Sequence, residues 1–292
     1  MKSIASALKK RTGRIRYKMD RLRENLAGSL PPRRIVFLHI PKCAGSSVNA
    51  LFKHAIGPSR NGSTILIDDR LNGVDFDRKI EMARSAPFVG GHFGAETLQL
   101  IRGDALTFTV LRDPFERIRS TYGHLHTRKD GNPLGHKVPH MSIEEYLLSE
   151  DPEILQWTDN VVARQLCARH DRNSVVGIGT QEMISRAITN LETIDKVIFL
   201  DELAAEMTGI MREAKIHYDG EMPRENVTAQ RAARQSTTAI APLSDRLLEI
   251  ALPRVAADLA VYQHALKRTV AHITFGATSD PVARRSALLP MT

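Results

Sequence analysis

Residues 35–47 constrain the fold of this chain more than any other segment. They read Ile-Val-Phe-Leu-His-Ile-Pro-Lys-Cys-Ala-Gly-Ser-Ser, so an apolar run leads directly into a loop of small residues. The apolar run predicts a buried strand. A Gly-containing loop at the start of a helix presents backbone N–H groups and the positive end of the helix dipole to an anion. The segment therefore predicts a strand, loop and helix that cradle a phosphate. A buried strand with a simple tight turn is the alternative.

The position of the lysine separates this loop from that of ordinary ATPases. In the Walker A loop the Lys follows the last Gly, whereas here Lys42 precedes Gly45. His39 lies inside the preceding strand and is predicted to be structural. The candidate anion-binding residues are those of the loop itself: Pro41, Lys42, Cys43, Ala44, Gly45, Ser46 and Ser47.

A second motif of the same kind follows another predicted strand. Residues 105–111 are apolar and β-branched, and they end at Arg112. Asp113 and Pro114 suit the N-cap and the first turn of a helix, and Ser120 lies about two turns further on. Arg offers phosphate a planar bidentate fork, and Ser adds a neutral donor. A surface Arg–Asp pair that closes a turn is the alternative, but two such motifs, each after a strand, favour a nucleotide held at both ends.

The two motifs resemble those of sulfotransferases that use 3′-phosphoadenosine 5′-phosphosulfate (PAPS). The loop is similar to the His-Ile-Pro-Lys-Thr/Ser-Ala-Gly-Thr/Ser-Ser loop of the branch that sulfates carbohydrates, the heparan and chondroitin type of sulfotransferase family 2. The resemblance implies that the loop holds the 5′-phosphosulfate and that Arg112 and Ser120 hold the 3′-phosphate. Cys43 stands where Thr or Ser is usual, and because a thiol is the weaker donor we expect one nucleotide contact to be lost. Other family-like segments extend the resemblance over most of residues 33–265: 90–93, 158–160, 164–166, 197–202, 226–228 and 258–262.

The resemblance also implies how a sulfuryl group is transferred. Lys42 would supply the cation at the leaving oxygen, and Ser46 and Ser47 would help to stabilise the 5′ end. His92 is the candidate base, because imidazole titrates near neutral pH and a family His matches it. A structural His92 that bonds a backbone carbonyl is the alternative, and Glu96 is the fallback base.

The predicted activity is transfer of a sulfuryl group from PAPS to a hydroxyl of a carbohydrate or glycan-like acceptor. Two other functions stay open. The first is a nucleotide-dependent kinase of P-loop ancestry, which requires a Lys after the final Gly that this loop lacks. The second is a non-catalytic adaptor with a basic arm, against which the intact Lys42, Arg112 and Ser120 argue. No metal is expected, because no acidic Mg²⁺ site lies beside the loop and the His spacing fits no compact zinc pattern. The histidines concerned are His124, His126, His136 and His140.

Two segments have roles that the sequence leaves open. Residues 127–141 are polar and rich in Gly, Pro and His, which predicts a mobile loop. This loop would either face an anionic acceptor or be merely solvated, and its basic residues are Arg128, Lys129 and Lys137. Arg164 and Gln165 would either reach the nucleotide or acceptor or tie their helix to the sheet.

Strands separated by helices predict an α/β fold, a P-loop-like parallel sheet with helices on both faces, as in the PAPS sulfotransferases. Ligands bind such sheets at the carboxyl ends of the strands. We expect strands at 34–40, 64–67, 87–91, 105–111 and 196–200. We expect helices at 45–55, 77–85, 114–126, 142–149, 159–169, 180–192, 202–214 (capped by Asp201) and 243–268 (interrupted by Pro253).

The basic charge of the chain lies in an N-terminal arm. Residues 1–34 carry eleven Lys and Arg and two acidic residues, a net charge of +9, whereas the whole 292-residue chain carries +8, so the rest carries −1. A nucleic-acid-binding body is therefore not expected. We expect an arm over 1–32 that is disordered, lies on an anionic membrane or docks on a partner. A sulfotransferase domain over 33–270 and a disordered tail over 275–292 would follow.

The sequence also predicts where the protein is found. No apolar stretch follows the basic arm, so no secretory signal is expected, and no window approaches the 18 apolar residues of a membrane span. Cys43 and Cys167 form no disulfide framework and suit a reducing compartment. We therefore expect a cytoplasmic protein, peripheral to the membrane if the arm binds there. The Golgi anchor of the eukaryotic relatives is not seen, so a bacterial source is expected.

Overall fold

The computed structural model describes the core of the chain and its long C-terminal helix. The described residues are 33–56, 64–67, 73–127, 134–168, 175, 178–216, 218, 222 and 240–276. Several predicted segments lie outside the described residues. These are the arm over 1–32, Arg128 and Lys129, the segment 226–228 and the tail from 277 onward.

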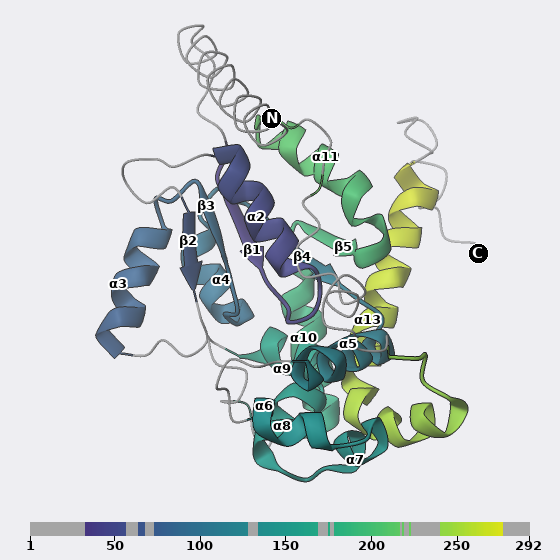
Figure 1. Cartoon of the computed structure of the whole chain (residues 1–292). Coiled ribbons are helices and arrows are strands. Elements are labelled where there is room, and N and C mark those ends of the chain that lie inside the picture. The colour runs from purple at the N-terminus through teal and green to yellow at the C-terminus, as the bar shows by residue number, and fades with distance from the viewer. Residues whose placement is uncertain are drawn as a thin grey trace, which may run out of the picture.

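A five-stranded parallel sheet forms the centre of the fold, as predicted (Figure 1). Its strands lie in the order β2-β3-β1-β4-β5, and every neighbouring pair is parallel. The apolar side chains of β1 and β4 are buried, because helices cover both faces of the sheet. The strands are β1 (Ile35–Leu38), β2 (Thr64–Ile67), β3 (Phe88–Gly91), β4 (Leu106–Leu111) and β5 (Lys196–Phe199).

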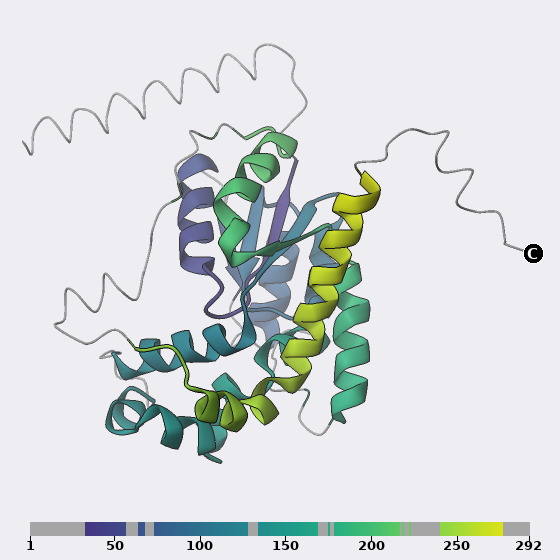
Figure 2. The same cartoon turned by 90° about the vertical axis from the view of Figure 1, so that its right-hand side faces the viewer.

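Helices pack on both faces of this sheet. Figure 2 shows α2 and α11 on one face and α10 and α13 on the other. The helices up to the middle of the chain are α2 (Gly45–Ile56), α3 (Gly73–Ala83), α4 (Ala95–Arg102), α5 (Pro114–His126), α6 (Leu134–Lys137), η1 (Val138–His140) and α7 (Ile143–Leu148). Those that follow are α8 (Pro152–Thr158), α9 (Val161–Cys167), α10 (Thr180–Glu192), η3 (Leu200–Glu202), α11 (Leu203–Glu213) and α13 (Asp245–Gly276).

A second layer of helices lies beyond the carboxyl ends of the strands. Helices α5 to α8 and the first turns of α13 gather there, below the sheet in Figure 1. This layer has its own apolar cluster, separate from the core around the sheet. Tyr146 and Val138 are wholly buried in it, and Ala251 and Val255 of α13 close it. The layer therefore covers the edge of the sheet at which a ligand is expected.

Four details of the predicted elements were wrong. The described part of the predicted mobile loop forms α6 and η1, because Leu134 and Val138 are buried in the second apolar cluster. Asp201 does not cap a helix, since it lies within η3 and α11 begins at Leu203.

Pro253 does not interrupt α13, and this correction has a physical cause. The ring removes one backbone donor. The flanking Ala251 and Val255 are fully buried, so packing holds the helix through that turn. Helix α13 runs on to Gly276, so the first two residues of the predicted tail are helical. Helices α4 and α8 were not predicted.

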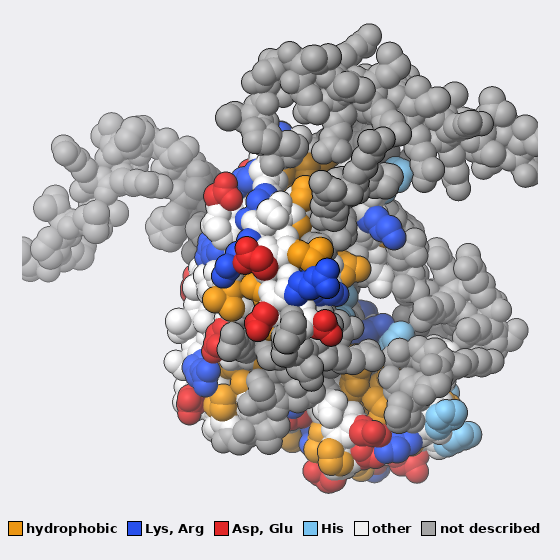
Figure 3. Space-filling model, turned by 90° about the vertical axis from the view of Figure 1, so that its left-hand side faces the viewer, with side chains coloured by type: hydrophobic (Ala, Val, Ile, Leu, Met, Phe, Trp, Pro, Cys, Tyr) orange, Lys and Arg blue, Asp and Glu red, His pale blue; other side chains and the backbone are white. Residues whose placement is uncertain are grey.

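The surface of the described core carries mixed charge. On the face shown in Figure 3, acidic and basic side chains alternate over the described residues, in keeping with the net charge of −1 outside residues 1–34. Within the described parts of the chain, no helix has both the length and the apolar character needed to cross a bilayer.

Candidate active site

Three neighbouring strands bring the predicted site residues to one edge of the sheet. The order β3-β1-β4 places the segments that follow these strands side by side, and Leu38 is in register with Gly91 on β3 and Thr109 on β4. The anion loop follows β1, His92 follows β3 and Arg112 follows β4. Residues far apart in the sequence therefore meet at the carboxyl ends of the strands, where parallel sheets bind ligands.

The loop after β1 has an unusual backbone conformation. Lys42 and Ala44 have φ angles of 68° and 57°, in the left-handed region that residues other than Gly adopt at a cost of about 1–2 kcal/mol each. The Cys43 N–H donates to the carbonyl of Ile40 at 3.2 Å, which closes the turn. Left-handed residues in a tight turn are one way to point successive N–H groups at an anion. Such strain is typical of ligand-binding loops.

The side chains of the loop divide into outward-facing and inward-facing groups. Ser46 is exposed, and Lys42 and Ser47 are half-buried and make further contacts. Cys43 is 0% exposed, its sulfur lies 3.7 Å from the carbonyl of Pro41, and burial raises the pKa of its thiol to about 12. In this conformation the thiol is buried and packs the loop against the body of the protein.

The second motif folds as the sequence predicts. Asp113 caps α5, because its carboxylate accepts a hydrogen bond from the N–H of Glu116 at 2.9 Å, and Pro114 occupies the first turn. Arg112 is half-buried, with Nη2 3.4 Å from the Glu116 carboxylate. The backbone N–H of Arg112 lies near the Cys43 thiol and opposes, to a small extent, the rise of its pKa on burial. The end of β4 thus lies beside the loop after β1.

The carboxylate of Glu116 pairs with two arginines at this end of α5. These are Arg112 and Arg119. Arg119 donates in addition to the carbonyl of Ile240 at 2.7 Å, just before α13. Ser120 is half-buried and lies one helical turn beyond Glu116, on the face of α5 toward which the side chain of Arg112 reaches from the end of β4.

His92 is held by the backbone of His39, the residue after β1. Its Nδ1 lies 3.0 Å from the carbonyl oxygen of His39, which can only accept a hydrogen bond. Nδ1 therefore carries the proton in the neutral ring, and Nε2 is the basic nitrogen. The two imidazole rings stack with centroids 4.1 Å apart.

His39 stays neutral beside His92. Burial lowers the pKa of the His39 imidazole well below 6.5, and the nearby His92 and Lys42 lower it further. Two stacked imidazoles do not readily both take up a proton, because like charges at this distance repel. His39 is therefore buried and neutral, as expected of a structural histidine.

Glu96 lies in a different environment from His92. It sits in the first turn of α4, half its side chain is exposed, and a carboxylate oxygen lies 3.8 Å from Nη2 of Arg186 on α10. Its N–H donates to the carbonyl of Ala168 at 3.3 Å. These contacts direct Glu96 toward Arg186 of α10, whereas the His92 ring lies beside His39.

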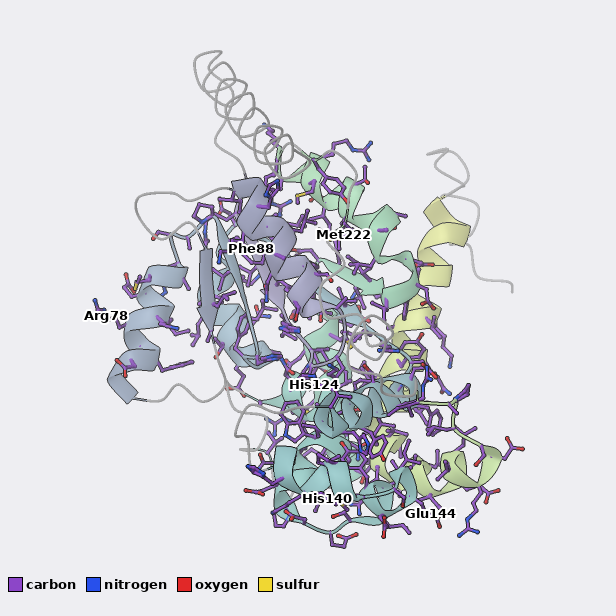
Figure 4. All side chains as sticks on the ribbon, viewed as in Figure 1. Arg78, Phe88, His124, His140, Glu144 and Met222 are labelled. Atoms are coloured by element: carbon purple, nitrogen blue, oxygen red, sulfur yellow. The ribbon has the colours of Figure 1, made fainter. Side chains whose placement is uncertain are left out.

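The four histidines considered as metal ligands are spread over α5, α6 and η1. In Figure 4, His124 lies on α5 near the edge of the sheet, whereas His140 lies at the far side of the helical layer. His126 has Nδ1 3.3 Å from the carbonyl of Val138. Within the described ranges no three His, Cys, Asp or Glu residues are grouped as metal ligands would be.

Lys137 has a structural place rather than one facing an acceptor. Its ammonium pairs with Asp151 at 2.8 Å and Glu153 at 2.7 Å, at the start of α8. Together with the folding of α6 and η1, these bonds make the described end of segment 127–141 part of the helical layer.

Arg164 and Gln165 both tie α9 to its surroundings. Arg164 is 5% exposed and donates to the carbonyls of Leu155 and Gln156. Gln165 is 1% exposed and its Nε2 donates to the carbonyls of His39 at 3.0 Å and Phe93 at 3.1 Å. The structure thus favours the second of the two sequence alternatives.

A buried polar network beneath the loop was not predicted. Arg117 of α5 and Asp258 of α13 are both 0% exposed, with Nη2 and Oδ2 3.7 Å apart. Asp258 also accepts from the N–H of Ala163 at 2.9 Å, and Asn160 accepts from the N–H of Ala257 at 2.8 Å. Asn160 adopts a left-handed conformation with φ 41°. The family-like segments 158–160 and 258–262 therefore hold α9 and α13 together, and a charged residue in an apolar helical pattern was the one signal that pointed to Asp258.

Comparison with known proteins gives a family. A family model described as "Sulfotransferase family" matches residues 30–263, which is more than half of the chain. No protein among the curated ones matches the chain.

Proposed function

This chain belongs to the sulfotransferase family, and from that premise we propose that it moves the sulfuryl group of PAPS to a hydroxyl of a carbohydrate or glycan-like acceptor. The observation that carries the proposal is the meeting of the strained loop, Arg112 and His92 at the adjacent ends of β1, β4 and β3. In this proposal the loop binds the 5′ end of the nucleotide, Arg112 binds its 3′-phosphate, and His92 acts as the base.

The residues at this edge fit the two anionic ends of PAPS. The loop offers N–H groups, the Lys42 ammonium and the Ser46 and Ser47 hydroxyls for the 5′-phosphosulfate. Arg112 and Ser120 offer a fork and a neutral donor for the 3′-phosphate. Bound PAPS would supply the activated sulfuryl group, and the protein would supply charge, orientation and a base.

His92 has the chemistry of a base at this place. Because Nδ1–H donates to the His39 carbonyl, Nε2 carries the lone pair that would accept the proton of the acceptor hydroxyl. Lys42 would stabilise the negative charge that develops on the leaving phosphate oxygen. The two residues thus act on opposite ends of the transfer.

The acceptor and the location of the protein are also proposals. The likeness of the loop to that of carbohydrate sulfotransferases supports a glycan hydroxyl. Cys43 and Cys167 are both free and buried, which supports a reducing, cytoplasmic location. The basic charge of residues 1–34 supports contact with an anionic membrane surface.

Calorimetry with two nucleotides tests the proposal first. A PAPS-dependent enzyme should bind 3′,5′-adenosine bisphosphate more tightly than ATP, whereas a kinase should show the reverse order. In a separate transfer assay, an inactive adaptor should transfer no sulfate. A screen of glycan acceptors with ³⁵S-labelled PAPS then identifies the substrate. Tight binding of ATP with no binding of the bisphosphate would contradict the proposal.

A further inference from the structure

One backbone carbonyl joins three elements around His92. The His39 oxygen, the first beyond the β1 ladder, accepts from Nδ1 of His92 at 3.0 Å and from Nε2 of Gln165 at 3.0 Å. A carbonyl oxygen has two lone pairs, so these two donors use its capacity fully. The His92 ring and the Gln165 amide are therefore neighbours on a shared acceptor.

The Gln165 amide is oriented without ambiguity. Its nitrogen lies between the carbonyl oxygens of His39 and Phe93, at 3.0 and 3.1 Å, and an amide oxygen in that place would be repelled by both. Phe93 directly follows His92, so Gln165 bridges the end of β1 to the residue after His92. The N–H of His92 in turn donates to the carbonyl of Ile67 at the end of β2.

One polar atom in this arrangement has no partner. Gln165 is 1% exposed, and its Oε1 finds no donor among the described residues. The amide nitrogen supplies a donor to the carbonyls of both His39 and Phe93, so an apolar side chain of the same shape would leave these two bonds unmade. The amide at position 165 therefore serves the two carbonyls on either side of the His92 ring contact and leaves its own oxygen unpaired.

From this geometry we propose that Gln165 is a positioning residue for His92. It fixes the His39 carbonyl so that His92 keeps its proton on Nδ1 and its lone pair on Nε2. The stacked ring of His39, 4.1 Å away, limits rotation of His92 out of this position. The catalytic part of the inference rests on the proposed role of His92 as base, but the tautomer itself does not.

The tautomer is measured directly by ¹⁵N NMR on protein labelled at its 11 histidines, with His92 assigned from a His92→Gln spectrum. We expect His92 in the full chain to be a single Nδ1–H tautomer. A wild-type His92 that carries its proton on Nε2 would overturn the proposal without any variant of Gln165.

The variant Gln165→Met keeps the length of the side chain but removes both donors. We expect its His92 signals to move toward a mixture of tautomers, and its kcat to fall about tenfold or more while the Kd for 3′,5′-adenosine bisphosphate stays unchanged. Gln165→Leu, which also has no donor, should behave in the same way and replaces the Met variant if that variant does not fold.

Asn190→Leu is the matched control. Asn190 on α10 donates its side-chain amide to the carbonyl of Leu166 at 2.7 Å, so this change removes a similar bond from the same helix, α9, next to Gln165. We expect the control to lose stability without any change in the His92 tautomer. If Gln165→Met keeps the wild-type His92 spectrum, the proposal is wrong. If the tautomer shifts but the wild-type protein transfers no sulfate, the positioning role stands and the proposed function fails.

Discussion

The imidazole of His39 lies directly on Gly45, the glycine of the anion loop. A Cβ at position 45 would stand 1.7 Å from Nε2 of His39, far inside van der Waals contact. The side chain of His39, the residue after β1, therefore limits how closely the loop can fold back, and only glycine fits beneath it. The loop conformation and the histidine pair form one packed unit.

Gly45→Ala should disrupt this unit. The ring of His39 must shift, so we expect a loss of about 1–3 kcal/mol of stability and of most binding of 3′,5′-adenosine bisphosphate. Chemical denaturation and calorimetry measure the two effects. The control is Gly209→Ala on α11, where a Cβ meets nothing within 4 Å and should stabilise the helix by up to about 1 kcal/mol. Normal nucleotide binding by Gly45→Ala would contradict the fit described here.

Arg112→Ala should weaken nucleotide binding selectively. The loss of one charge-assisted contact corresponds to about 1.5–3 kcal/mol, so 3′,5′-adenosine bisphosphate should bind about tenfold more weakly or worse. Adenosine 5′-phosphosulfate lacks the 3′-phosphate and should be affected far less. Arg246→Ala removes an exposed arginine that pairs with Glu144 and should change neither affinity. Equal weakening of both ligands would show that Arg112 does not read the 3′-phosphate.

Lys42→Ala and His92→Ala should separate binding from chemistry. Lys42 acts on the nucleotide, so its loss should lower both affinity and rate. His92 acts on the proton of the acceptor, so its loss should lower the single-turnover rate by about 10²–10⁴-fold with nucleotide affinity almost unchanged. Circular dichroism checks the fold of each variant, and His140→Ala at an exposed position is the control. A folded His92→Ala that transfers sulfate at the wild-type rate would disprove the base assignment and turn attention to Glu96.

His39 should make the fold sensitive to acid. Its pKa in the folded state lies well below 6.5, so below pH 6.5 the unfolded chain takes up a proton that the folded chain refuses. Stability should therefore fall as the pH falls from 6.5 toward the folded pKa, by up to about 1.4 kcal/mol per pH unit. His39→Phe keeps an aromatic ring and should flatten this slope in urea titrations, whereas His140→Gln should keep it. An unchanged slope in His39→Phe would mean that other groups cause the acid sensitivity.

The sequence by itself determined the parts of this protein that depend on neighbouring residues. Apolar runs and the positions of Gly and Pro predict the strand and loop of residues 35–47 and the parallel α/β class. A capping residue predicts the start of the helix at Asp113. All these signals act within a few residues of the chain. The positions of Lys42 and Arg112 after predicted strands came from the same local patterns, whereas their predicted roles, and the prediction of His92 as base, also drew on the resemblance to the sulfotransferases.

Only the tertiary structure decided how these parts meet. Gln165 and His39 are 126 positions apart, and Arg117 and Asp258 come from different helices, so no local pattern pairs them. Burial against distant elements likewise decides three other features. These are the buried side chain of Cys43, the folded segment at α6 and η1, and the continuous helix α13. The strand order β2-β3-β1-β4-β5 creates these contacts, because it sets which strand ends are neighbours, and that order is a property of the packed sheet rather than of any segment.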